Sequence, residues 1–528
     1  MADETAMRKR DLLALIGAAG GGAAMYFAMT ALGQAAASDY AGPIRLDGDP
    51  KGASVLVLGA GVAGMVAALE LRRAGYRVQV LEYNARAGGR TWTIRGGDTY
   101  TELGGATQHC DFADGLYLNP GPWRIPYHHR ALLDYCRRLG VTLEPFIQVN
   151  HNAYLHARGV FGGKPQRLGA VQADFNGGIA ELLAKATDQH ALDATLTAED
   201  AGRLLDSLRG WGALGADYRY RPGRAASQRR GWARPPGGGL TAEPIASQPL
   251  ALADLLRAGF WRALATGMEY DYQTTLFQPV GGMDMVARGF VRAVGDLIRY
   301  NARVGAIHQD DRGVTVTYTD RTDGSTRQAH ADWCVCTIPL SVLNQIDIQV
   351  GGPMKAAIAA LPYAPGLKIG LQFRRRFWEE DEAIYGGISY TDLPVTMIGY
   401  PNTGYLADGP GVLLGAYAFG PYAYEFTALD PAARVARAVA DGAQIHPQYH
   451  AEFLSGMAVG WHRVPWTMGC FGLWSRESRA AHYRDLCAID GRIVLAGEHA
   501  SYIPAWQEGA ILSSLDAIAR LHRRVVAP

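Results

Sequence analysis

A glycine-rich turn between an apolar strand and a helix constrains the fold of this 528-residue chain more than any other feature. The pattern predicts a strand over 55–58, a helix over about 63–74 and a second strand over 78–82. Strand, helix and strand in this order form a βαβ unit, which predicts an α/β fold with a parallel sheet.

The glycines of the turn indicate what this unit binds. Gly59, Gly61 and Gly64 have the spacing G-x-G-x-x-G at the opening of the helix, where missing side chains let the backbone approach a pyrophosphate. Glu82 ends the second strand, about 20 residues further on, where a carboxylate can accept hydrogen bonds from ribose hydroxyls. The alternative is a glycine turn that binds no ligand. Because the strand, the helix and Glu82 all have the expected spacing from the glycines, the sequence predicts a dinucleotide site.

A second glycine loop follows at residues 85–91. It carries Arg86, Gly89 and Arg90, which suit a second approach to a diphosphate. The first motif alone does not separate NAD from FAD, and the second loop favours FAD.

Composition excludes several classes of protein. The chain is 48% hydrophobic and 19% charged, and its 51 Lys and Arg against 50 Asp and Glu leave a net charge of +1. Such a balance gives no global attraction to nucleic acid or to anionic membranes. The six cysteines lack the paired C-x-x-C spacing of a zinc site, so we expect neither a disulfide framework nor a metal site.

The first 37 residues resemble an export signal. Arg8-Lys9-Arg10 precedes a run of apolar residues and glycines over 12–32, and Ala35-Ala36-Ala37 follow. The order resembles a twin-arginine signal, which predicts a periplasmic or secreted protein. An uncleaved membrane anchor is the alternative, but the many Gly and Ala residues favour cleavage and no membrane span in the mature chain.

The rest of the chain predicts an FAD-binding Rossmann-like domain interleaved with a substrate domain that combines a mixed sheet and a helical insertion. The expected parts are FAD-binding segments at 52–140, 278–340 and 468–528, a helical insertion at 141–277 and a substrate-binding segment at 341–467. The pattern predicts insertion helices over 178–187, 198–210 and 250–265, strands over 302–318, 333–338, 368–373, 412–418 and 492–496, and a last helix from about 509.

An irregular stretch over 218–239 contains six arginines. A solvated loop or a lid over the active site is the favoured interpretation, and a nucleic-acid patch is the alternative.

Several segments resemble the flavin amine-oxidase superfamily. They are the Gly-Gly-Arg loop at 88–90, Gly366-Leu367-Lys368-Ile369-Gly370, Met468-Gly469-Cys470-Phe471-Gly472, Gly497-Glu498-His499 and Trp506-Gln507-Glu508-Gly509-Ala510. The resemblance extends from about residue 53 to the last helix and implies an amine-oxidase fold that binds FAD. It also implies that Lys368 holds a water near flavin N5, and that Phe471 and Trp506 form aromatic walls. A solvent-facing lysine and ordinary core aromatics are the alternatives.

Two further segments resemble the secreted L-amino acid oxidases within this superfamily. Tyr117-Leu118-Asn119-Pro120-Gly121-Pro122-Trp123-Arg124-Ile125-Pro126 is similar to their substrate-arginine segment, which implies that Arg124 forms a two-point salt bridge with the substrate carboxylate. The segment from Thr391 to Asn402 is similar to the one that carries their carboxylate-binding tyrosine, here Tyr400. A surface ion pair for Arg124 and core packing for Tyr400 are the alternatives.

One departure and one ambiguity accompany the resemblance. The L-amino acid oxidases place a substrate-side histidine just before the Val-Gly-Gly-Met-Asp segment, whereas residues 266–278 contain none. Cys470 lies where mitochondrial monoamine oxidases attach FAD covalently, but non-covalent FAD is favoured because free cysteines are usually small buried hydrophobes.

Together these features predict oxidative deamination of L-amino acids. Hydride would pass from Cα to flavin N5, and oxygen and water would yield a 2-oxo acid, ammonia and hydrogen peroxide. Alternatives are a monooxygenase resembling tryptophan 2-monooxygenase, a monoamine oxidase, or a non-catalytic flavoprotein that binds a partner. The sequence is compatible with a homodimer.

The predicted residues form two sets. The catalytic set is Lys368, Arg124, Tyr400, Trp506 and Phe471. The cofactor-binding set is Gly59, Gly61, Ala63, Gly64, Glu82, Arg86, Gly89, Arg90, Gly121, Pro122, Trp123, Arg124, Val304, Gly497, Glu498, Trp506 and Gln507.

Overall fold

The computed structural model describes residues 38–240 and 242–527. The export signal expected over residues 1–37 lies outside the described residues. Within the described part of the chain, none of the helices has the length and apolar character needed to cross a membrane.

A six-stranded sheet organises one half of the molecule. Its strand order is β12-β2-β1-β16-β24-β23, and all neighbours are parallel except β23, which runs antiparallel to β24. The strands are β1 (Ser54–Leu58), β2 (Arg77–Leu81), β12 (Ile298–Arg299), β16 (Trp333–Cys336), β23 (Ile489–Asp490) and β24 (Ile493–Leu495). The predicted βαβ unit is therefore present, with β1 and β2 side by side.

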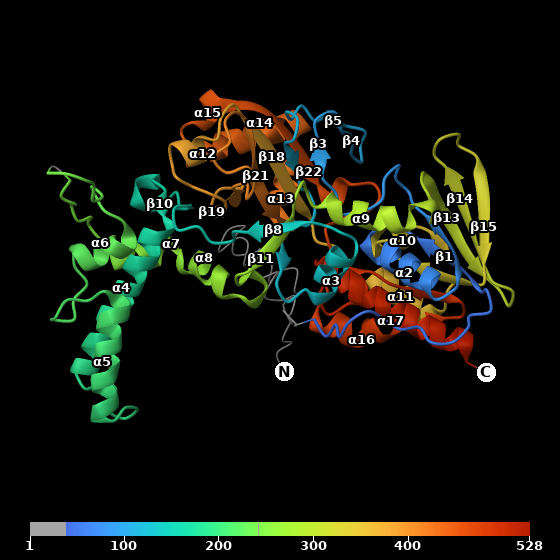
Figure 1. The fold of residues 1–528 in the computed structure, drawn as a ribbon, viewed down its shortest axis with the longest axis horizontal. Helices are drawn as coiled ribbons and strands as arrows, with labels where there is room; N and C mark the ends of the chain where they lie inside the picture. The colour runs from blue at the N-terminus through green and yellow to red at the C-terminus, as the bar shows by residue number, and fades with distance from the viewer. Residues whose placement is uncertain (1–37, 241, 528) are drawn as a thin grey trace, which may run out of the picture.

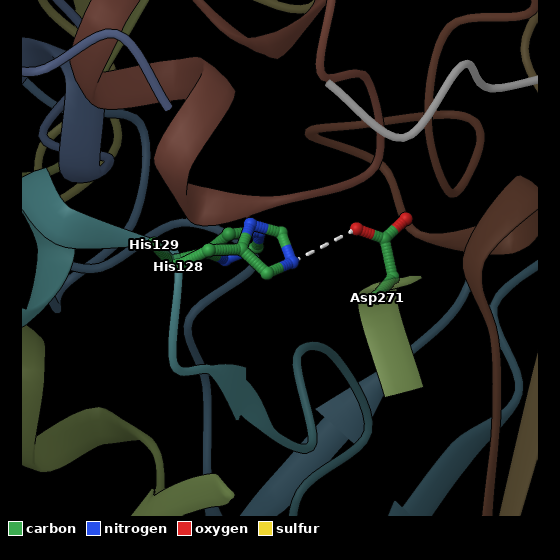
Figure 2. A group of neighbouring side chains, drawn as sticks. All are labelled: His128, His129 and Asp271. Carbon is green, nitrogen blue, oxygen red and sulfur yellow. Dashed lines mark ion pairs between the residues drawn. The ribbon is translucent and has the colours of Figure 1, made fainter. Parts of the chain in front are cut away.

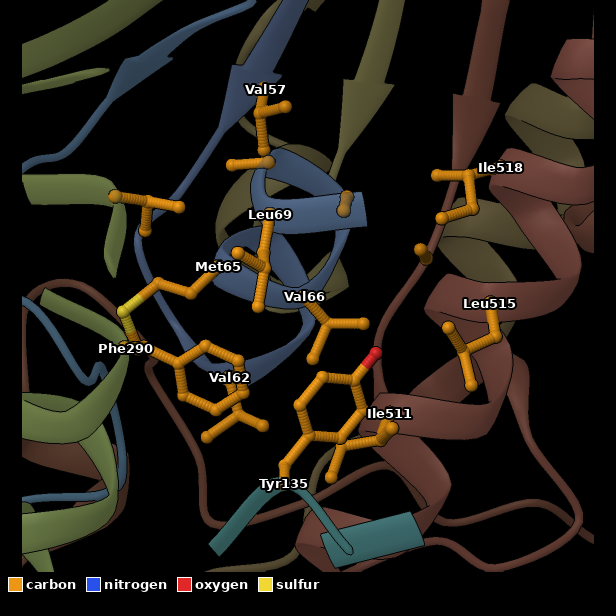
Figure 3. Packing of buried hydrophobic residues seen from close by; sticks show 14 of the residues in the cluster. Val57, Val62, Met65, Val66, Leu69, Tyr135, Phe290, Ile511, Leu515 and Ile518 are labelled. Atoms are coloured by element: carbon orange, nitrogen blue, oxygen red, sulfur yellow. The ribbon is translucent and has the colours of Figure 1, made fainter. Parts of the chain in front are cut away.

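The side chains of β1 alternate between the two faces of this sheet, and each face has its own hydrophobic core. Val55 and Val57 pack into one cluster, and Leu56 and Leu58 into another, because successive side chains of a strand point to opposite faces. The first face is covered by α2 (Val62–Arg73), α3 (Arg130–Arg138), α9 (Asp284–Val294) and α17 (Gln507–Val526). Figure 3 shows side chains of these four helices meeting below Val57.

The opposite face carries shorter elements. The helices there are α10 (Leu340–Leu343), α11 (Gly352–Ala360) and α16 (Arg476–Cys487). A four-stranded sheet of β13 (Ala302–Gln309), β14 (Val314–Asp320), β15 (Thr326–Ala331) and β17 (Asp347–Ile348) adds to the same core.

A seven-stranded mixed sheet organises the second half, in the order β10-β9-β19-β20-β21-β18-β22. Its strands are β9 (Tyr154–His156), β10 (Gln166–Arg167), β18 (Gly366–Phe373), β19 (Ile388–Thr391), β20 (Met397–Gly399), β21 (Gly411–Phe419) and β22 (Phe453–Gly460). All residues of β18 are buried. The helices α12 (Phe377–Glu380), α13 (Gly420–Thr427), α14 (Pro431–Gly442) and α15 (Tyr449–Glu452) lie beside this sheet (Figure 1).

Further short strands and turns lie between these larger elements. They are β3 (Ile94–Arg95), β4 (Thr99–Thr101), β5 (Thr107–His109), β6 (Tyr117–Leu118), β7 (Ile125–Pro126), β8 (Leu143–Phe146), β11 (Leu276–Pro279), η1 (Phe161–Gly163), η2 (Thr266–Met268), η3 (Tyr270–Tyr272), η4 (Gly295–Leu297), η5 (Trp461–Arg463) and η6 (Glu498–Ala500). Glu102, between β4 and β5, accepts two hydrogen bonds of 2.7 Å from Arg434 of α14. Both side chains are buried, so this ion pair joins the halves internally.

The helical insertion projects from the body as an arm (Figure 1). It contains α4 (Leu168–Asp188), α5 (Ala198–Gly212), α6 (Arg224–Arg230), α7 (Leu252–Ala258) and α8 (Trp261–Ala265). The helix expected over 178–187 is the second half of the longer α4. The helix expected over 250–265 is broken, because Gly259 adopts a positive φ of 66° and ends α7.

Candidate functional site

A cavity of about 1920 Å³ lies between the parallel sheet and the seven-stranded sheet. Pockets for drug-sized ligands usually measure about 300–1,000 Å³, so this cavity has room for a large cofactor together with a substrate. Its wall includes most of the residues predicted from the sequence, and both halves of the molecule contribute to it.

The first glycine loop forms one part of this wall. Gly59 and Gly61 line the cavity, and a Cβ added to Gly61 would meet no atom within 4 Å. A backbone left open in this way at the start of α2 is a cradle for a phosphate group. Gly64 does not line the cavity, and a Cβ there would collide with the carbonyl oxygen of Gly59, so this glycine permits close packing of helix on strand.

Glu82 lies beside this loop at the end of β2. Its carboxylate accepts hydrogen bonds from the backbone N–H of Ala60, at 2.7 Å, and from Asn84. Burial raises the pKa of Glu82, and these hydrogen bonds oppose the rise. Val304 of β13 lines the same end of the cavity, so strand ends from two sheets surround the position where a nucleotide would lie. The loop and this carboxylate fit a dinucleotide.

The second glycine loop packs directly on the first. The backbone N–H of Gly88 donates to the carbonyl of Ala60 at 2.8 Å, and Gly89 lies against Gly61. Arg90 lines the cavity. Arg86 does not, because its guanidinium donates to the carbonyls of Ala87 and Gly89 and lies over the Trp92 ring at 4.6 Å.

The C-terminal segment continues the cavity wall beside the second glycine loop. Arg90 donates to the Glu498 carboxylate and to the Cys470 carbonyl, both at 2.8 Å. Gly497, Glu498, Trp506 and Gln507 all line the cavity, and Gln507 is the first residue of the 20-residue helix α17. The N-terminus of a long helix carries partial positive charge, which favours an anionic ligand here.

Arg124 is held at the other end of the cavity by the loop between β6 and β7. Gly121, Pro122, Trp123 and Arg124 all line the cavity. A Cβ at Gly121 would collide with the Arg90 carbonyl, so only glycine fits where this loop crosses the second glycine loop. The Arg124 side chain is only 5% exposed, and its guanidinium lies 4.5 Å from the centre of the Tyr272 ring.

Lys368 lies directly behind this loop rather than in the cavity wall. Its amine donates to the carbonyl oxygens of Gly121, at 2.6 Å, and of Asn119, at 3.2 Å. Burial lowers the pKa of the Lys368 amine to about 7, with the Arg124 charge acting in the same direction. Lys368 therefore fixes the backbone that presents Arg124.

Tyr400 is absent from the cavity wall that includes Arg124, which departs from the predicted two-residue carboxylate clamp. Tyr400 does not line the cavity, and its hydroxyl is within hydrogen-bond distance of Ser389, at 2.7 Å, and of His446, at 2.6 Å. Gly399, the preceding residue, abuts the Trp123 ring. Because successive side chains alternate between faces, Tyr400 points into the core beside the seven-stranded sheet.

Aromatic side chains nevertheless surround the Arg124 end of the cavity. Trp506 and Phe471 line it as predicted, and so do Tyr272 and Tyr417, which sequence reasoning missed. Tyr417 pairs with Lys368 across β21 and β18, so the register of the sheet, which no local motif reveals, brings it here.

Acidic groups also reach this end from η3. Asp271 lines the cavity, and burial, reinforced by Asp271, raises the pKa of nearby Glu269 to about 7. The stretch 266–278, which lacks the expected histidine, therefore contributes a carboxylate and an aromatic ring instead. Two histidines, His128 and His129, lie beside them, after Arg124 in sequence.

The arginine-rich stretch does not cover the cavity. None of residues 218–239 lines it. Arg230 instead donates to the buried carboxylate of Asp174, at 2.8 Å, within the arm. The lid interpretation therefore has no geometric support in this structure.

Comparisons with known proteins identify the family and the fold of this chain. A family model described as flavin containing amine oxidoreductase matches residues 62–522. An L-amino-acid oxidase of Siganus canaliculatus is 28% identical over 483 residues, covering 89% of this chain and 86% of that protein. An L-amino-acid oxidase of Vipera ammodytes ammodytes is 30% identical over 482 residues, covering 89% and 92% respectively.

Solved structures give the same fold. Putrescine oxidase bound to putrescine superposes with a TM-score of 0.58 at 19% identity, covering 90% of this chain and 99% of that one. Cyclohexylamine oxidase from Brevibacterium oxydans IH-35A gives 0.58 at 18% identity, covering 89% and 99%. Given the family match over most of its length, the chain belongs to the flavin-containing amine oxidoreductases and uses a flavin.

Proposed function

We propose that this chain is an FAD-dependent oxidase that deaminates L-amino acids to 2-oxo acids, ammonia and hydrogen peroxide. The observation that carries the proposal is the buried Arg124 guanidinium in the wall of the flavin cavity. A planar guanidinium is the group best suited to hold a carboxylate at two points. The relatives described as L-amino-acid oxidases support the same substrate class.

The residues around the cavity divide the work of positioning the substrate. When bound, the flavin supplies the two-electron oxidation of the Cα–N bond, with oxygen as the final acceptor. Arg124 binds the α-carboxylate, and the rings of Trp506 and Phe471 flank the amine and side chain. The apolar surroundings exclude water and favour the neutral amine, which alone has the electron pair needed for oxidation. Lys368 positions the Arg124 loop through its bonds to two carbonyls.

We also propose that FAD is bound non-covalently. Cys470 lines the cavity, but burial raises the pKa of its thiol to about 12. A thiol that stays protonated is a poor nucleophile for a covalent link. Flavin released into the supernatant on acid precipitation would support this proposal, whereas flavin that stays with the pellet would contradict it.

Oxidation of amines without a carboxylate is the second candidate. It is favoured by the absence of Tyr400 from the cavity wall and by the presence of Asp271 in it, since a carboxylate at the substrate end attracts an ammonium group. Peroxide formation with L-amino acids, their D-enantiomers and the matching decarboxylated amines separates the two candidates. Stereoselective peroxide from the L-acids supports the proposal, and peroxide from amines alone replaces it.

Two variants test the carboxylate site. Arg124→Ala should lower kcat/KM for L-amino acids by roughly 30- to 5,000-fold, which corresponds to the loss of about 2 to 5 kcal/mol from a charge-assisted pair. Tyr400→Phe is the matched comparison, and it should retain kcat/KM within about threefold because its hydroxyl contacts Ser389 and His446.

Flavin absorbance must remain normal in both variants for the comparison to be valid. Near-normal kcat/KM in Arg124→Ala would refute the role of Arg124. A loss in Tyr400→Phe as large as that in Arg124→Ala would restore the clamp that the sequence predicted.

A further inference from the structure

Three side chains that the proposed reaction does not require gather beside the cavity. His128 and His129 precede α3, shortly after Arg124, and Asp271 lies in η3. The exposed fractions of these residues are 5%, 0% and 8%. Their potential ligand atoms all lie within 4.8 Å of one another. Figure 2 shows the Asp271 carboxylate facing a ring nitrogen of His128, with the His129 ring close behind.

Apart from the ion pair of 3.3 Å between His128 and Asp271, these buried groups have no hydrogen-bond partner among the described residues. Both ring nitrogens of His128, both of His129 and Oδ1 of Asp271 have none among the residues that the structure describes. An unsatisfied buried polar atom costs about 1–3 kcal/mol, and native proteins contain few of them. A proton shared between His128 and Asp271 would satisfy only two of the five atoms. Several such atoms at one place therefore indicate a bound species that accepts electron pairs from all three side chains.

The distances suit one metal ion. Two ligands bonded to a tetrahedral zinc ion at about 2.0–2.2 Å lie about 3.4 Å apart. The separation between Nε2 of His128 and Oδ1 of Asp271 is 3.3 Å. The potential ligand atom of His129 lies within 4.8 Å of those of His128 and Asp271.

The chemistry of the ligand atoms narrows the choice of ion. Imidazole nitrogens bind zinc and similar transition-metal ions, whereas calcium and magnesium prefer oxygen ligands. Two histidines and one carboxylate are also a common ligand set in zinc sites that keep a fourth position open. We propose that His128, His129 and Asp271 bind one divalent ion of the zinc class.

An ion at this position would contact segments that also pack against Arg124 and Trp506. Asp271 precedes Tyr272, whose ring lies against Arg124, and His129 contacts the Trp506 ring with centroids 4.9 Å apart. An ion bound here would tie η3 to the segment that follows Arg124. Because Asp271 also lines the cavity, the open position of the ion would lie next to it.

The test is zinc binding by the flavin-loaded protein after treatment with EDTA. Calorimetric titration with Zn²⁺ should give one site per chain. His129→Gln and Asp271→Asn should each lower the zinc affinity by more than about 100-fold, which exceeds the 10- to 100-fold loss typical of removing a group that only hydrogen-bonds to a metal ligand. His308→Gln is the matched control, since it removes a histidine from an exposed His–Asp pair of 2.8 Å. It should bind zinc like the wild type.

A measurement on the wild type alone keeps the proposal falsifiable if a variant fails to fold. Crystals grown with Zn²⁺ should show anomalous scattering at the zinc edge between His128, His129 and Asp271. Absence of that peak, absence of stoichiometric binding, or equal zinc affinity in Asp271→Asn and wild type would each overturn the site.

Discussion

Replacing Lys368 by methionine should change how the stability of the protein depends on pH. The amine lies in the fully buried strand β18 and is only 1% exposed. Burial lowers its pKa from 10.5 to about 7. In the unfolded chain the amine regains its ordinary pKa, so folding releases a proton over the pH range between these two values.

The sign and size of the effect follow from this difference. Because the unfolded state binds more protons between pH 7 and 10.5, the free energy of unfolding rises with pH over that range. At 1.36 kcal/mol per pH unit, the full penalty below pH 7 is about 5 kcal/mol, and it vanishes above pH 10.5. Between pH 6 and pH 9, the wild type should therefore gain ~3 kcal/mol relative to Lys368→Met.

Other consequences of the substitution cancel in this comparison. Methionine cannot donate to the carbonyls of Asn119 and Gly121, and the difference between a charged and a neutral donor is already contained in the lowered pKa of Lys368. Urea unfolding of flavin-loaded wild type and variant, at one fixed flavin concentration, measures the difference. Lys355→Met, at an exposed position on α11, is the control and should show no such pH dependence. If wild type and Lys368→Met differ by the same amount at pH 6 and pH 9, the lysine is charged throughout and the argument fails.

Two further predictions concern the frame of the site. Glu102→Gln should lower the free energy of unfolding by about 3–5 kcal/mol, because the Arg434 side chain, which is only 1% exposed, would keep its charge without the Glu102 carboxylate. A loss below about 1 kcal/mol in urea unfolding would contradict this prediction. Gly64→Ala should prevent folding, because its Cβ would collide with the Gly59 carbonyl. Gly61→Ala should fold but bind flavin more weakly, because its methyl group would enter the cavity. Circular dichroism and bound-flavin absorbance distinguish these outcomes, and identical behaviour of the two variants would refute the assignment.

The parts of the site that the sequence predicted depend on local backbone requirements. The turn after β1 and the loop around Gly121 need glycine because a side chain would collide with a neighbouring backbone or fill the cavity. Such requirements leave a fixed spacing in the sequence, so the motif and its position on a strand end were predictable together. The parallel pairing of β1 with β2 follows from the same βαβ pattern.

Tyr400 was predicted at the carboxylate site, but the structure places it in the core. The segment around it resembles a substrate-binding one, but the face on which a strand residue lies depends on register, and a shift of one residue exchanges the two faces. Gly399 abuts Trp123, so Tyr400 points to the core, whereas Tyr417 reaches the cavity side from β21. The sheet partners that set this register come from distant segments, which a single sequence does not reveal.

The substrate end of the cavity explains why the class of reaction was easier to infer than the substrate. The flavin end consists of motifs with strict backbone geometry, whereas Asp271 and Tyr272 arrive at the substrate end from η3, at the end of the helical arm. Their positions depend on packing against the Arg124 loop, and side chains there can change without disturbing the cofactor. Substrate preference should therefore follow substitutions in residues 269–272 and 128–129, while substitutions in the glycine loops should affect flavin binding for every substrate alike.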